Sequence, residues 1–370
     1  MTYYLSEKQN ERGATILKLS YLIAKHKYSI QLKLKNTKLI NDYTQFIQYK
    51  TKYIPSLIIN KKIIKNIPIV GNLLTKIFWI LKYRRENPLK ELYCIICSIF
   101  IKTNGITIEK RNPLLIVSLT TIPSRISRLY LVIETLLQQS IKPDYIILWL
   151  SESDFSEDYL KSENYATRRL LKQKNRGLKI EFCKDLRSYT KILYTLKQYP
   201  EAIVVSADDD FYYPKNWLKD LYKSYIENPD YVHCHMARSI RKSTESSLLP
   251  HYQWLAHYDK FQGPSNNIFP YTGHGCLFPP GSLHPEVFNE KVFLNISPNH
   301  DDAWFKAMTL LNGLPTKRVK QVSLHLQSVR RTQSTSLGML NIDQGQFEPQ
   351  VEAIFKKYNL YQYLDDNDPD

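Results

Sequence analysis

A short apolar segment that ends in three consecutive acidic residues places the strongest constraint on this chain. Residues 202–207 are Ala-Ile-Val-Val-Ser-Ala, and Asp208, Asp209 and Asp210 follow at once. A run of this length and composition is typical of a strand that is buried on both faces of a sheet. Adjacent carboxylates repel one another, so we expect a cation to offset their charge. A divalent ion bound by these carboxylates and by a substrate phosphate satisfies that requirement.

The same acids admit a simpler interpretation, in which they lie in a solvated loop and one of them caps the following helix. Residues 212–214, Tyr-Tyr-Pro, end the strand, and residues 215–228 are predicted to form that helix. We favour the metal site, because an apolar strand that ends in three acids is costly without a compensating cation.

Strands and helices are predicted to alternate along the middle of the chain. The predicted strands cover residues 114–119, 145–150, 178–183 and 202–207, and the predicted helices cover residues 126–139, 159–174 (with Gly177 as its stop) and 189–198. Such alternation with short links predicts an α/β fold, with a parallel sheet between two layers of helices. Ligands of open sheets bind beyond the carboxyl ends of the strands. We therefore expect the polar loops 120–125, 184–187 and 208–210 to converge on one crevice.

The remainder of the chain is less regular. Residues 262–285 hold four glycines and five prolines, and a long loop inside a compact domain is usually functional. A second acidic pair, Asp301 and Asp302, precedes a short helix predicted at residues 303–311, where the helix dipole favours carboxylates. One further helix is predicted at residues 349–358, and residues 365–370 are expected to be disordered.

The basic charge of the chain is concentrated in its first third. Residues 1–111 hold 21 Lys and Arg residues and 6 Asp and Glu residues, so they carry +15 of the formal net charge of +16. Such asymmetry indicates an anionic partner, either a membrane surface or a nucleic acid. Nucleic acid is the weaker alternative and is not expected, because the charge is not accompanied by a recognised binding motif.

An apolar stripe in the segment 70–81 supports the membrane alternative. Its members fall at helical spacing, with basic residues and Trp79 close by: Val70, Leu73, Leu74, Ile77, Phe78 and Leu81. Such a helix can lie in a membrane interface or pack on its own domain, and the sequence leaves both open. No apolar run in the first third reaches the roughly 18 residues of a spanning helix. Residues 1–10 lack the apolar region of a signal peptide.

The cysteines indicate a reducing compartment. There are five, an odd number in a long chain, which argues against a disulfide framework. Cys94 and Cys97 form a C-x-x-C pair inside the apolar segment 92–101. Because no second pair supports zinc or redox chemistry, we expect both to lie on a buried helix face.

Several polar motifs occur in order along residues 113–345. They are Thr-Thr-Ile-Pro-Ser-Arg at 120–125, Asp-Leu-Arg-Ser-Tyr-Thr-Lys at 185–191, Asp-Asp-Asp at 208–210, Gly-His-Gly at 273–275 with Pro-Pro-Gly at 279–281, and His-Asp-Asp-Ala-Trp at 300–304. In this order they resemble GT-A-type glycosyltransferases, especially bacterial enzymes that build capsule or lipopolysaccharide. An isolated D-x-D motif is weak evidence, but the ordered set is more specific. The resemblance implies a GT-A (Rossmann-like) fold with a mixed, mainly parallel sheet and helices on both faces.

The resemblance also implies a metal site. Asp208 and Asp210 would hold Mn²⁺ or Mg²⁺ against the diphosphate of a nucleotide sugar, with Asp209 beside them. The ion would neutralise the charge that develops on the leaving nucleoside diphosphate. His325 follows an apolar, strand-like run and is either a further metal ligand or a hydrogen-bonded core histidine.

Other residues match the donor-binding positions of that family. Thr121, Pro123 and Arg125 match the loop that cups the base and ribose of the nucleotide, and Asp185 matches an acid that reads the base or ribose. Lys191 could reach the diphosphate as a point charge. For the three charged residues the alternative is a surface ion pair or a helix end, and we favour the binding role.

The second acidic pair matches the family's catalytic motif. In inverting members a carboxylate there removes the proton from the acceptor hydroxyl. We assign Asp302 as this base and Asp301 as the residue that orients the acceptor, although Asp301 could also be a helix N-cap. The family often has Glu-Asp at these positions, so the division of roles stays open. Four residues are assigned to the acceptor side: Gly273, His274, Gly275 and Trp304.

His233 and His235 could suggest a zinc site, because they point to the same face of a predicted strand. Two ligands do not make a zinc site, so we expect a structural or acceptor-side role.

Together these features predict a metal-dependent, inverting glycosyltransferase that acts on a cell-surface glycan or lipid-linked acceptor. We expect three parts: a basic, mainly helical region at residues 1–111, a catalytic domain at 112–345, and a C-terminal helix and acidic tail at 346–370. The basic region would hold the enzyme on the cytoplasmic face of the cell membrane. A nucleotidyl- or sugar-phosphate transferase is the rival enzyme, and a glycan-binding or membrane-scaffold protein is the rival without catalysis.

Overall fold

The computed structural model describes residues 88–161, 164–254, 262–320, 324–333, 341 and 345–365. The chain divides into two compact units, residues 1–75 and 76–370, and all of the described residues belong to the second. The amphipathic helix expected at residues 70–81 and most of the basic region therefore lie outside the described residues. None of the helices in the described ranges is both long and apolar enough to cross a membrane.

Most of the predicted helices and strands are present close to their expected positions, and the structure adds further elements that were not predicted. The α-helices are α5 (Pro88–Phe100), α6 (Pro123–Leu137), α7 (Glu157–Lys161), α8 (Tyr165–Lys174), α9 (Thr190–Gln198), α10 (Trp217–Glu227), α11 (Glu290–Ile296), α12 (Asp301–Leu311) and α13 (Phe347–Tyr358). Short 3₁₀ helices are η1 (Arg187–Tyr189), η2 (His251–Gln253), η3 (Thr272–His274), η4 (Pro285–Phe288) and η7 (Leu360–Tyr363). The strands are β1 (Leu115–Thr120), β2 (Tyr145–Ser151), β3 (Leu178–Cys183), β4 (Ile203–Ser206), β5 (Phe211–Tyr212), β6 (Val232–Cys234), β7 (Ala237–Ser239), β8 (Lys242–Thr244), β9 (Ser247–Leu248), β10 (Ile268–Pro270), β11 (Cys276–Phe278), β12 (Thr316–Arg318) and β13 (Gln327–Ser328).

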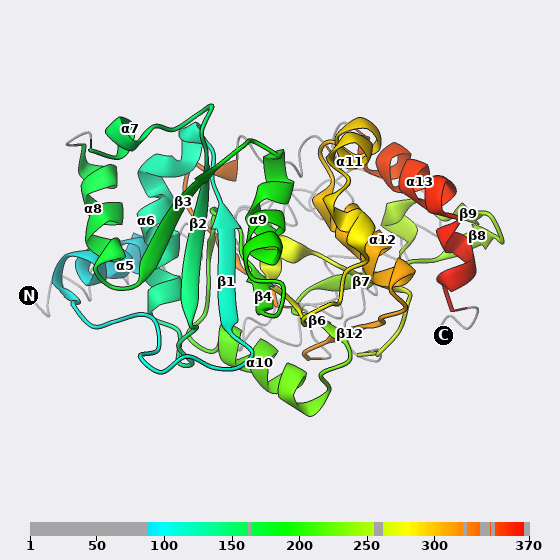
Figure 1. Ribbon diagram of the computed structural model, residues 1–370, viewed down its shortest axis with the longest axis horizontal. Coiled ribbons are helices and arrows are strands. Elements are labelled where there is room, and N and C mark those ends of the chain that lie inside the picture. Colours follow the sequence, from blue (N-terminus) through cyan, green and yellow to red (C-terminus); the bar gives the residue numbers. More distant parts are fainter. Residues whose placement is uncertain are drawn as a thin grey trace, which may run out of the picture. The chain divides into compact units, whose positions relative to one another are not determined.

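Seven of these strands form one mixed sheet in the order β12-β6-β11-β4-β1-β2-β3 (Figure 1). β1 is parallel to β2 and β4, β2 is parallel to β3, and β6 is parallel to β12. β11 is antiparallel to both of its neighbours, β4 and β6. The predicted α/β fold with a mixed, mainly parallel sheet is confirmed. Because β11 is reversed and Cys276 pairs with Ser206, the residues before β11 lie where β4 ends.

The central strands are buried on both faces, as their continuous apolar runs predict. In β4, Val204 belongs to one hydrophobic core, whereas Ile203 and Val205 belong to the other. Helices α9, α12 and α13 contribute to the first core, and α5, α6, α8 and α10 contribute to the second. Figure 1 shows α6 and α8 on one side of the sheet and α9 on the other.

Helix α5 packs against α6 and α8, so this part of the basic region is joined to the α/β unit. Cys94 and Cys97 are buried on its inner side, which confirms the prediction for the C-x-x-C pair. All five cysteines are free thiols. The outer side of the helix is apolar and exposed, with Leu92, Tyr93 and Phe100 among the exposed residues.

The single helix predicted at residues 159–174 is wrong. Helix α7 ends at Lys161, and α8 begins after Asn164, whose side-chain oxygen accepts hydrogen bonds from the backbone N–H groups of Ala166 and Thr167, both at 3.0 Å. Asparagine is a favourable N-cap, because its oxygen satisfies N–H groups that have no partner inside the helix.

The C-terminal segment is also part of the folded unit. Helix α13 packs against α12, and its Phe347, Val351 and Phe355 belong to the first core. Asp365 was expected to begin a disordered tail, but its carboxylate accepts a hydrogen bond from the hydroxyl of Ser265 at 2.6 Å. That part of the prediction is wrong, and residues 366–370 lie outside the described residues.

Candidate active site

Asp209 of the Asp208–Asp210 loop is held by two side chains from the segment that follows β1. Thr121 donates a hydrogen bond to its Oδ2 at 2.5 Å, and Arg125 donates to its Oδ1 at 2.6 Å. Thr121 follows β1 and Arg125 lies in the first turn of α6, so the predicted meeting of the loops after β1 and β4 is confirmed. Burial raises the pKa of Asp209, whereas Arg125 and Thr121 act in the opposite direction.

Asp210 is less well compensated. Its Oδ2 lies 3.2 Å from Nη1 of Arg125 and accepts a hydrogen bond from Gln333 at 3.0 Å. Its Oδ1 is buried, and no described residue donates a hydrogen bond to it. Burial and the charges of Asp209 and Asp208 raise the pKa of Asp210 to about 7. A cation placed at Oδ1 would give this oxygen a partner and would offset the repulsion between Asp210 and the two neighbouring carboxylates.

Asp208 faces the same loop from a more open position, with a side chain that is 33% exposed. Its Oδ1 accepts a hydrogen bond from Lys191 at 2.9 Å. Its backbone N–H donates to the hydroxyl of Tyr213, which also donates to the carbonyl of Gly273 at 2.8 Å. A Cβ atom on Gly273 would lie 1.9 Å from Oδ2 of Asp208, so a glycine is required for this approach.

Lys191 connects the two acidic segments. Its buried ammonium group lies 2.9 Å from Oδ1 of Asp208 and 2.9 Å from Oδ2 of Asp301. Burial alone lowers the pKa of Lys191, but the carboxylates of Asp208, Asp301 and Asp302 outweigh it and hold that pKa well above its usual value. Lys191 also holds the pKa of Asp301 below its usual value, against the effect of burial. Both members of this ion pair are therefore charged at neutral pH.

Asp302 has a different environment. Its Oδ1 accepts hydrogen bonds from the backbone N–H of Thr272, at 3.0 Å, and from the hydroxyl of the same residue. Thr272 lies in η3, which the reversed strand β11 places beside the end of β4. Burial, followed by the charge of Asp301, raises the pKa of Asp302 to about 7. A carboxyl group with this pKa exchanges a proton readily near neutral pH.

These residues fit a hard divalent cation. Asp208 and Asp210 offer carboxylate oxygens, and Oδ1 of Asp210 lacks a hydrogen-bond donor. Such ions are often held by one or two carboxylates together with substrate phosphates. Within the described ranges, no group of three or more His, Cys, Asp and Glu side chains is arranged to hold a metal.

His325 is not brought into such a group. It is exposed, so the alternative of a hydrogen-bonded core histidine is wrong. It lies close enough to His274 for its charge to oppose protonation of that ring, whose pKa is lowered to about 4 chiefly by burial. The ring of His274 lies against Phe211, at 4.8 Å between centroids.

Asp185 is another predicted site residue, assigned to the donor side. Asp185 is exposed, and its carboxylate accepts a hydrogen bond from the backbone N–H of Arg187 at 2.7 Å. The loop 184–187 reaches instead toward α11 and α12, where Arg187 contacts Asn299 and Lys184 pairs with Glu290. The contact with Asn299 brings the loop beside the segment that leads into Asp301, but none of these contacts joins it to the loops 120–125 or 208–210.

Trp304, assigned to the acceptor side, is fully buried. Its indole N–H donates to the carbonyl of Val287 at 3.1 Å, and its ring packs near Phe293. No part of its side chain is open to an acceptor, so this assignment conflicts with the structure. The reason is geometric, because Trp304 lies on the side of α12 that faces α11 and α13.

Gly275 and the two strand histidines have structural roles. Gly275 has a φ of +110°, and a Cβ there would overlap the indole of Trp217 at 2.3 Å. His235 is hydrogen-bonded to the carbonyl of Trp217, and His233 to the hydroxyl of Ser224, both at 2.9 Å. Burial lowers the pKa of both histidines to about 4. The structural interpretation of His233 and His235 agrees with these contacts.

The structure adds residues that the sequence patterns did not single out. Thr272 holds Asp302, Tyr213 holds the backbone of Asp208, and Gln333 binds Asp210. Gln333 belongs to the segment 324–333, whose strand β13 pairs with β5 just beyond the acidic loop. The backbone N–H of Val329 also donates to the carbonyl of Asp210 at 2.7 Å.

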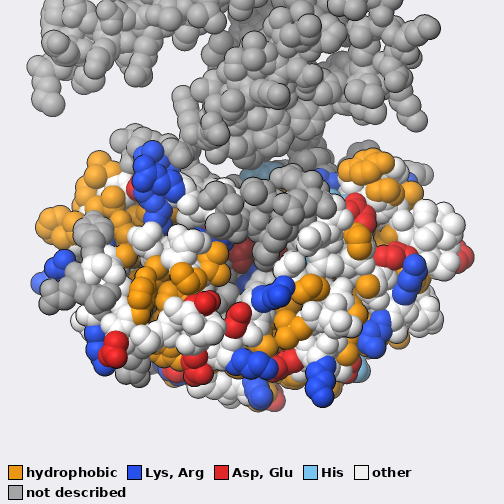
Figure 2. All heavy atoms as spheres, turned by 90° about the horizontal axis from the view of Figure 1, so that it is seen from above, with side chains coloured by type: hydrophobic (Ala, Val, Ile, Leu, Met, Phe, Trp, Pro, Cys, Tyr) orange, Lys and Arg blue, Asp and Glu red, His pale blue; other side chains and the backbone are white. Residues whose placement is uncertain are grey.

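Figure 2 shows acidic and basic side chains together in a hollow of the face toward which the parallel strands point.

No protein-family model matches the sequence, and no curated protein matches it. Solved structures that are similar to this chain include TarS residues 1–349 from S. aureus, with a TM-score of 0.38 and 14% identity over 55% of this chain and 57% of that chain. The chain thus spans little more than half of that structure. The mannosyltransferase PcManGT from Pyrobaculum calidifontis, in complex with GDP-Man and Mn²⁺, has a TM-score of 0.40 and 11% identity over 76% of this chain and 73% of that chain.

A third similar structure is the inositol-1-phosphate CTP transferase from T. maritima. It has a TM-score of 0.35 and 9% identity, over 68% of this chain and 97% of that chain.

Proposed function

We propose that the protein is a metal-dependent glycosyltransferase, which transfers a sugar from a nucleotide-sugar donor with inversion at the anomeric carbon. The observation that carries this proposal is the contact of Lys191 with Asp208 and Asp301. This contact brings Asp208, which pairs with Asp210 as a potential metal ligand, next to Asp301 and Asp302. The pKa of Asp302 is raised to about 7. Donor and acceptor chemistry need these two kinds of group side by side.

The donor side is built from Asp208, Asp210, Arg125 and Lys191. Asp208 and Asp210 would hold Mn²⁺ or Mg²⁺, and the ion would supply positive charge that offsets the charge on the departing nucleoside diphosphate. Arg125 and Thr121 fix Asp209, which holds the loop in place. Lys191 adds a fixed positive charge that no change of pH near neutrality removes.

The acceptor side is built from Asp302 and Thr272. Asp302 accepts the proton of the acceptor hydroxyl while that oxygen attacks the anomeric carbon. Thr272 orients the carboxyl group through two hydrogen bonds to the same oxygen, Oδ1, which leaves Oδ2 for the acceptor. Asp301 remains ionised beside Lys191 and so serves to position this end of α12.

The test is a screen of nucleotide sugars for cleavage in the presence of Mn²⁺, with the nucleotide product identified. A glycosyltransferase releases a nucleoside diphosphate. A nucleotidyltransferase instead transfers the nucleoside monophosphate part of a nucleoside triphosphate to a phosphate acceptor and releases pyrophosphate, so a parallel assay with nucleoside triphosphates detects it. A binding protein without catalysis yields neither product, and it would tolerate Asp208→Asn and Asp210→Asn without loss of biological activity.

The acceptor is proposed to be a cell-surface glycan or its lipid-linked precursor, used at the cytoplasmic face of the membrane. The support is the charge of +15 in residues 1–111, because anionic headgroups attract nearby Lys and Arg by about 1 kcal/mol each. Full-length protein should float with anionic liposomes and detach as salt is raised. A chain of residues 76–370, which keeps the compact unit whole, should float less. Equal flotation would contradict this placement.

A further inference from the structure

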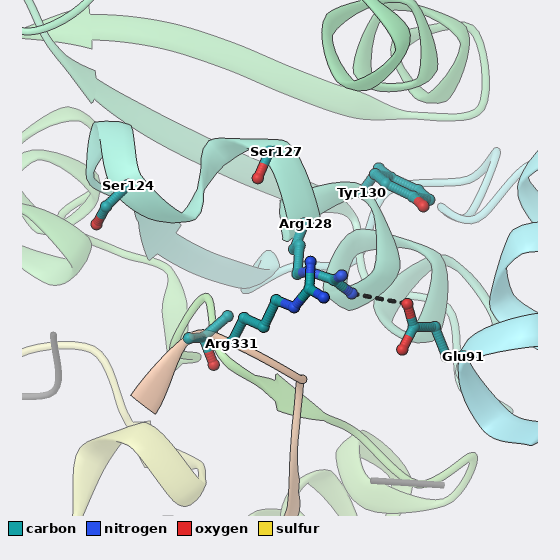
Figure 3. A pocket seen from close by; sticks show the side chains of 7 residues that line it. Glu91, Ser124, Ser127, Arg128, Tyr130 and Arg331 are labelled. Carbon is teal, nitrogen blue, oxygen red and sulfur yellow. Dashed lines mark hydrogen bonds and ion pairs between the residues drawn. The ribbon is translucent and has the colours of Figure 1, made fainter. Parts of the chain in front are cut away.

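A polar cavity lies outside the acidic site, between α5, α6 and the segment 324–333. Its volume is about 450 Å³, within the range of small-molecule sites. The residues that line it are Glu91, Ser124, Ser127, Arg128, Tyr130, Arg331 and Thr332. Figure 3 shows the side chains of Arg128 and Arg331 extending toward one another, one from α6 and the other from the segment 324–333.

The charge around this cavity is positive. Arg128 donates to Oε1 of Glu91 at 2.7 Å, and Nε of Arg330 lies 4.0 Å from Oε2 of the same carboxylate. Arg128 and Arg331 line the cavity, and Arg128 and Arg330 both face the single carboxylate of Glu91, so arginines outnumber acids here. Like charges converge in this way when an anion can sit between them, and guanidinium groups match phosphate oxygens in a bidentate geometry.

Of the arginines at this cavity, Arg331 is the one that is available to bind a ligand. It makes no hydrogen bond or ion pair with any residue that the structure describes, and its side chain is exposed. Its backbone has a φ of +60°, a left-handed conformation that is unfavourable for a residue with a Cβ. Strained backbone of this kind is concentrated at binding and catalytic sites. The hydroxyl groups of Ser124 and Ser127 add donors near the N-terminus of α6, where the helix dipole favours anions.

Two residues that line the cavity are adjacent in sequence to residues that bind the acidic loop. Ser124 precedes Arg125, which binds Asp209, and Thr332 precedes Gln333, which binds Asp210. An anion held by Arg331 would therefore fix the segment that supports Asp210. On its other side, Glu91 is followed by the exposed apolar surface of α5, which begins at Leu92.

We propose that the cavity between Arg128 and Arg331 is an anion site for a phosphate or diphosphate group, separate from the position of the donor diphosphate. The phosphate belongs either to a soluble compound or to a lipid whose apolar part lies along α5. Because the site is defined by its own cavity and charges, the proposal does not depend on the transfer reaction.

The first test is calorimetric titration of the full-length chain with pyrophosphate in the presence of EDTA, so that no metal ion mediates binding. Arg331→Gln should weaken binding about tenfold, the usual effect of losing one charge-assisted contact. Arg168→Gln is the matched control, since it removes an exposed arginine of α8 that does not line the cavity. Glu91→Gln should strengthen binding, because it removes the competing carboxylate from Arg128.

The second test distinguishes the source of the phosphate. Flotation with phosphatidylcholine vesicles that contain phosphatidic acid compares Arg331→Gln with Arg168→Gln, which have equal net charge. Weaker flotation of Arg331→Gln supports a lipid phosphate. Equal flotation with unequal pyrophosphate affinity supports a soluble phosphate. If the two variants match in both measurements, or if pyrophosphate does not bind the unmodified chain, the proposal is overturned.

Discussion

The ammonium group of Lys191 lies 2.9 Å from Oδ2 of Asp301, and through this contact α9 is joined to the first turn of α12. The same group lies 2.9 Å from Asp208. One buried lysine therefore compensates a carboxylate at the end of β4 and another at the start of α12. The charge of Lys191 thus contributes to the pKa values of both Asp301 and Asp302.

Replacing Lys191 with methionine should destabilise the fold. Asp301 would be left as a buried charge without its partner, and the loss of one member of a buried ion pair typically costs about 3–5 kcal/mol. The loss should be smaller at pH 5 than at pH 8, because protonation of the stranded carboxyl group removes its charge. Urea denaturation at the two pH values measures this, with Lys197→Met, at an exposed position of α9, as the control. Equal stability of both variants would contradict the assigned ion pair.

Replacing Gly273 with alanine should displace Asp208. The added Cβ would lie 1.9 Å from Oδ2 of that carboxylate, closer than any real contact. We expect a fall of at least tenfold in Mn²⁺-dependent binding of a nucleoside diphosphate, with a small change in thermal stability. Gly281→Ala is the control for general destabilisation, because a Cβ there meets no atom within 4 Å but the φ of +66° makes the substitution strain the backbone. Unchanged binding by Gly273→Ala would show that Asp208 is not a ligand.

Asp302 should control the pH dependence of transfer. A general base acts when it is deprotonated, and the pKa of Asp302 is raised to about 7, so the rate should rise with pH through that value. Asp302→Asn should abolish the rise and lower the rate by about 10²–10⁴-fold while donor affinity is kept. Asp301→Asn should keep the rise but shift it to lower pH, since the charge of Asp301 contributes to the raised pKa of Asp302. If Asp301→Asn instead abolishes the rise, the two roles are reversed.

Much of the framework was predictable from local patterns. The strands around residues 114–119, 145–150, 178–183 and 202–207 were visible as apolar runs, and the polar residues after them mark the carboxyl ends of a parallel sheet. The meeting of Thr121 and Arg125 with Asp209 follows from that rule.

The reversed strand β11 was not predictable, because a three-residue strand carries no periodic signal and its pairing with β4 is long-range. Yet this strand places Thr272 against Asp302 and Gly273 against Asp208. The support of Asp210 by Gln333 also depends on distant pairing, between β5 and β13. Trp304 was assigned to the acceptor side but is buried, because an aromatic residue next to a catalytic motif can pack in a core as well as it can contact a sugar.

The most direct test of the central claim is calorimetric titration of UDP, GDP, CDP and dTDP into the full-length chain with Mn²⁺, repeated for Asp210→Asn and Asp230→Asn. Asp210 offers a buried carboxylate oxygen that lacks a hydrogen-bond donor, whereas Asp230 is exposed, in the connection between α10 and β6. The account predicts that the unmodified chain and Asp230→Asn bind at least one of the four in a Mn²⁺-dependent manner, and that Asp210→Asn remains folded but does not. Equal affinity of Asp210→Asn and the unmodified chain would contradict it.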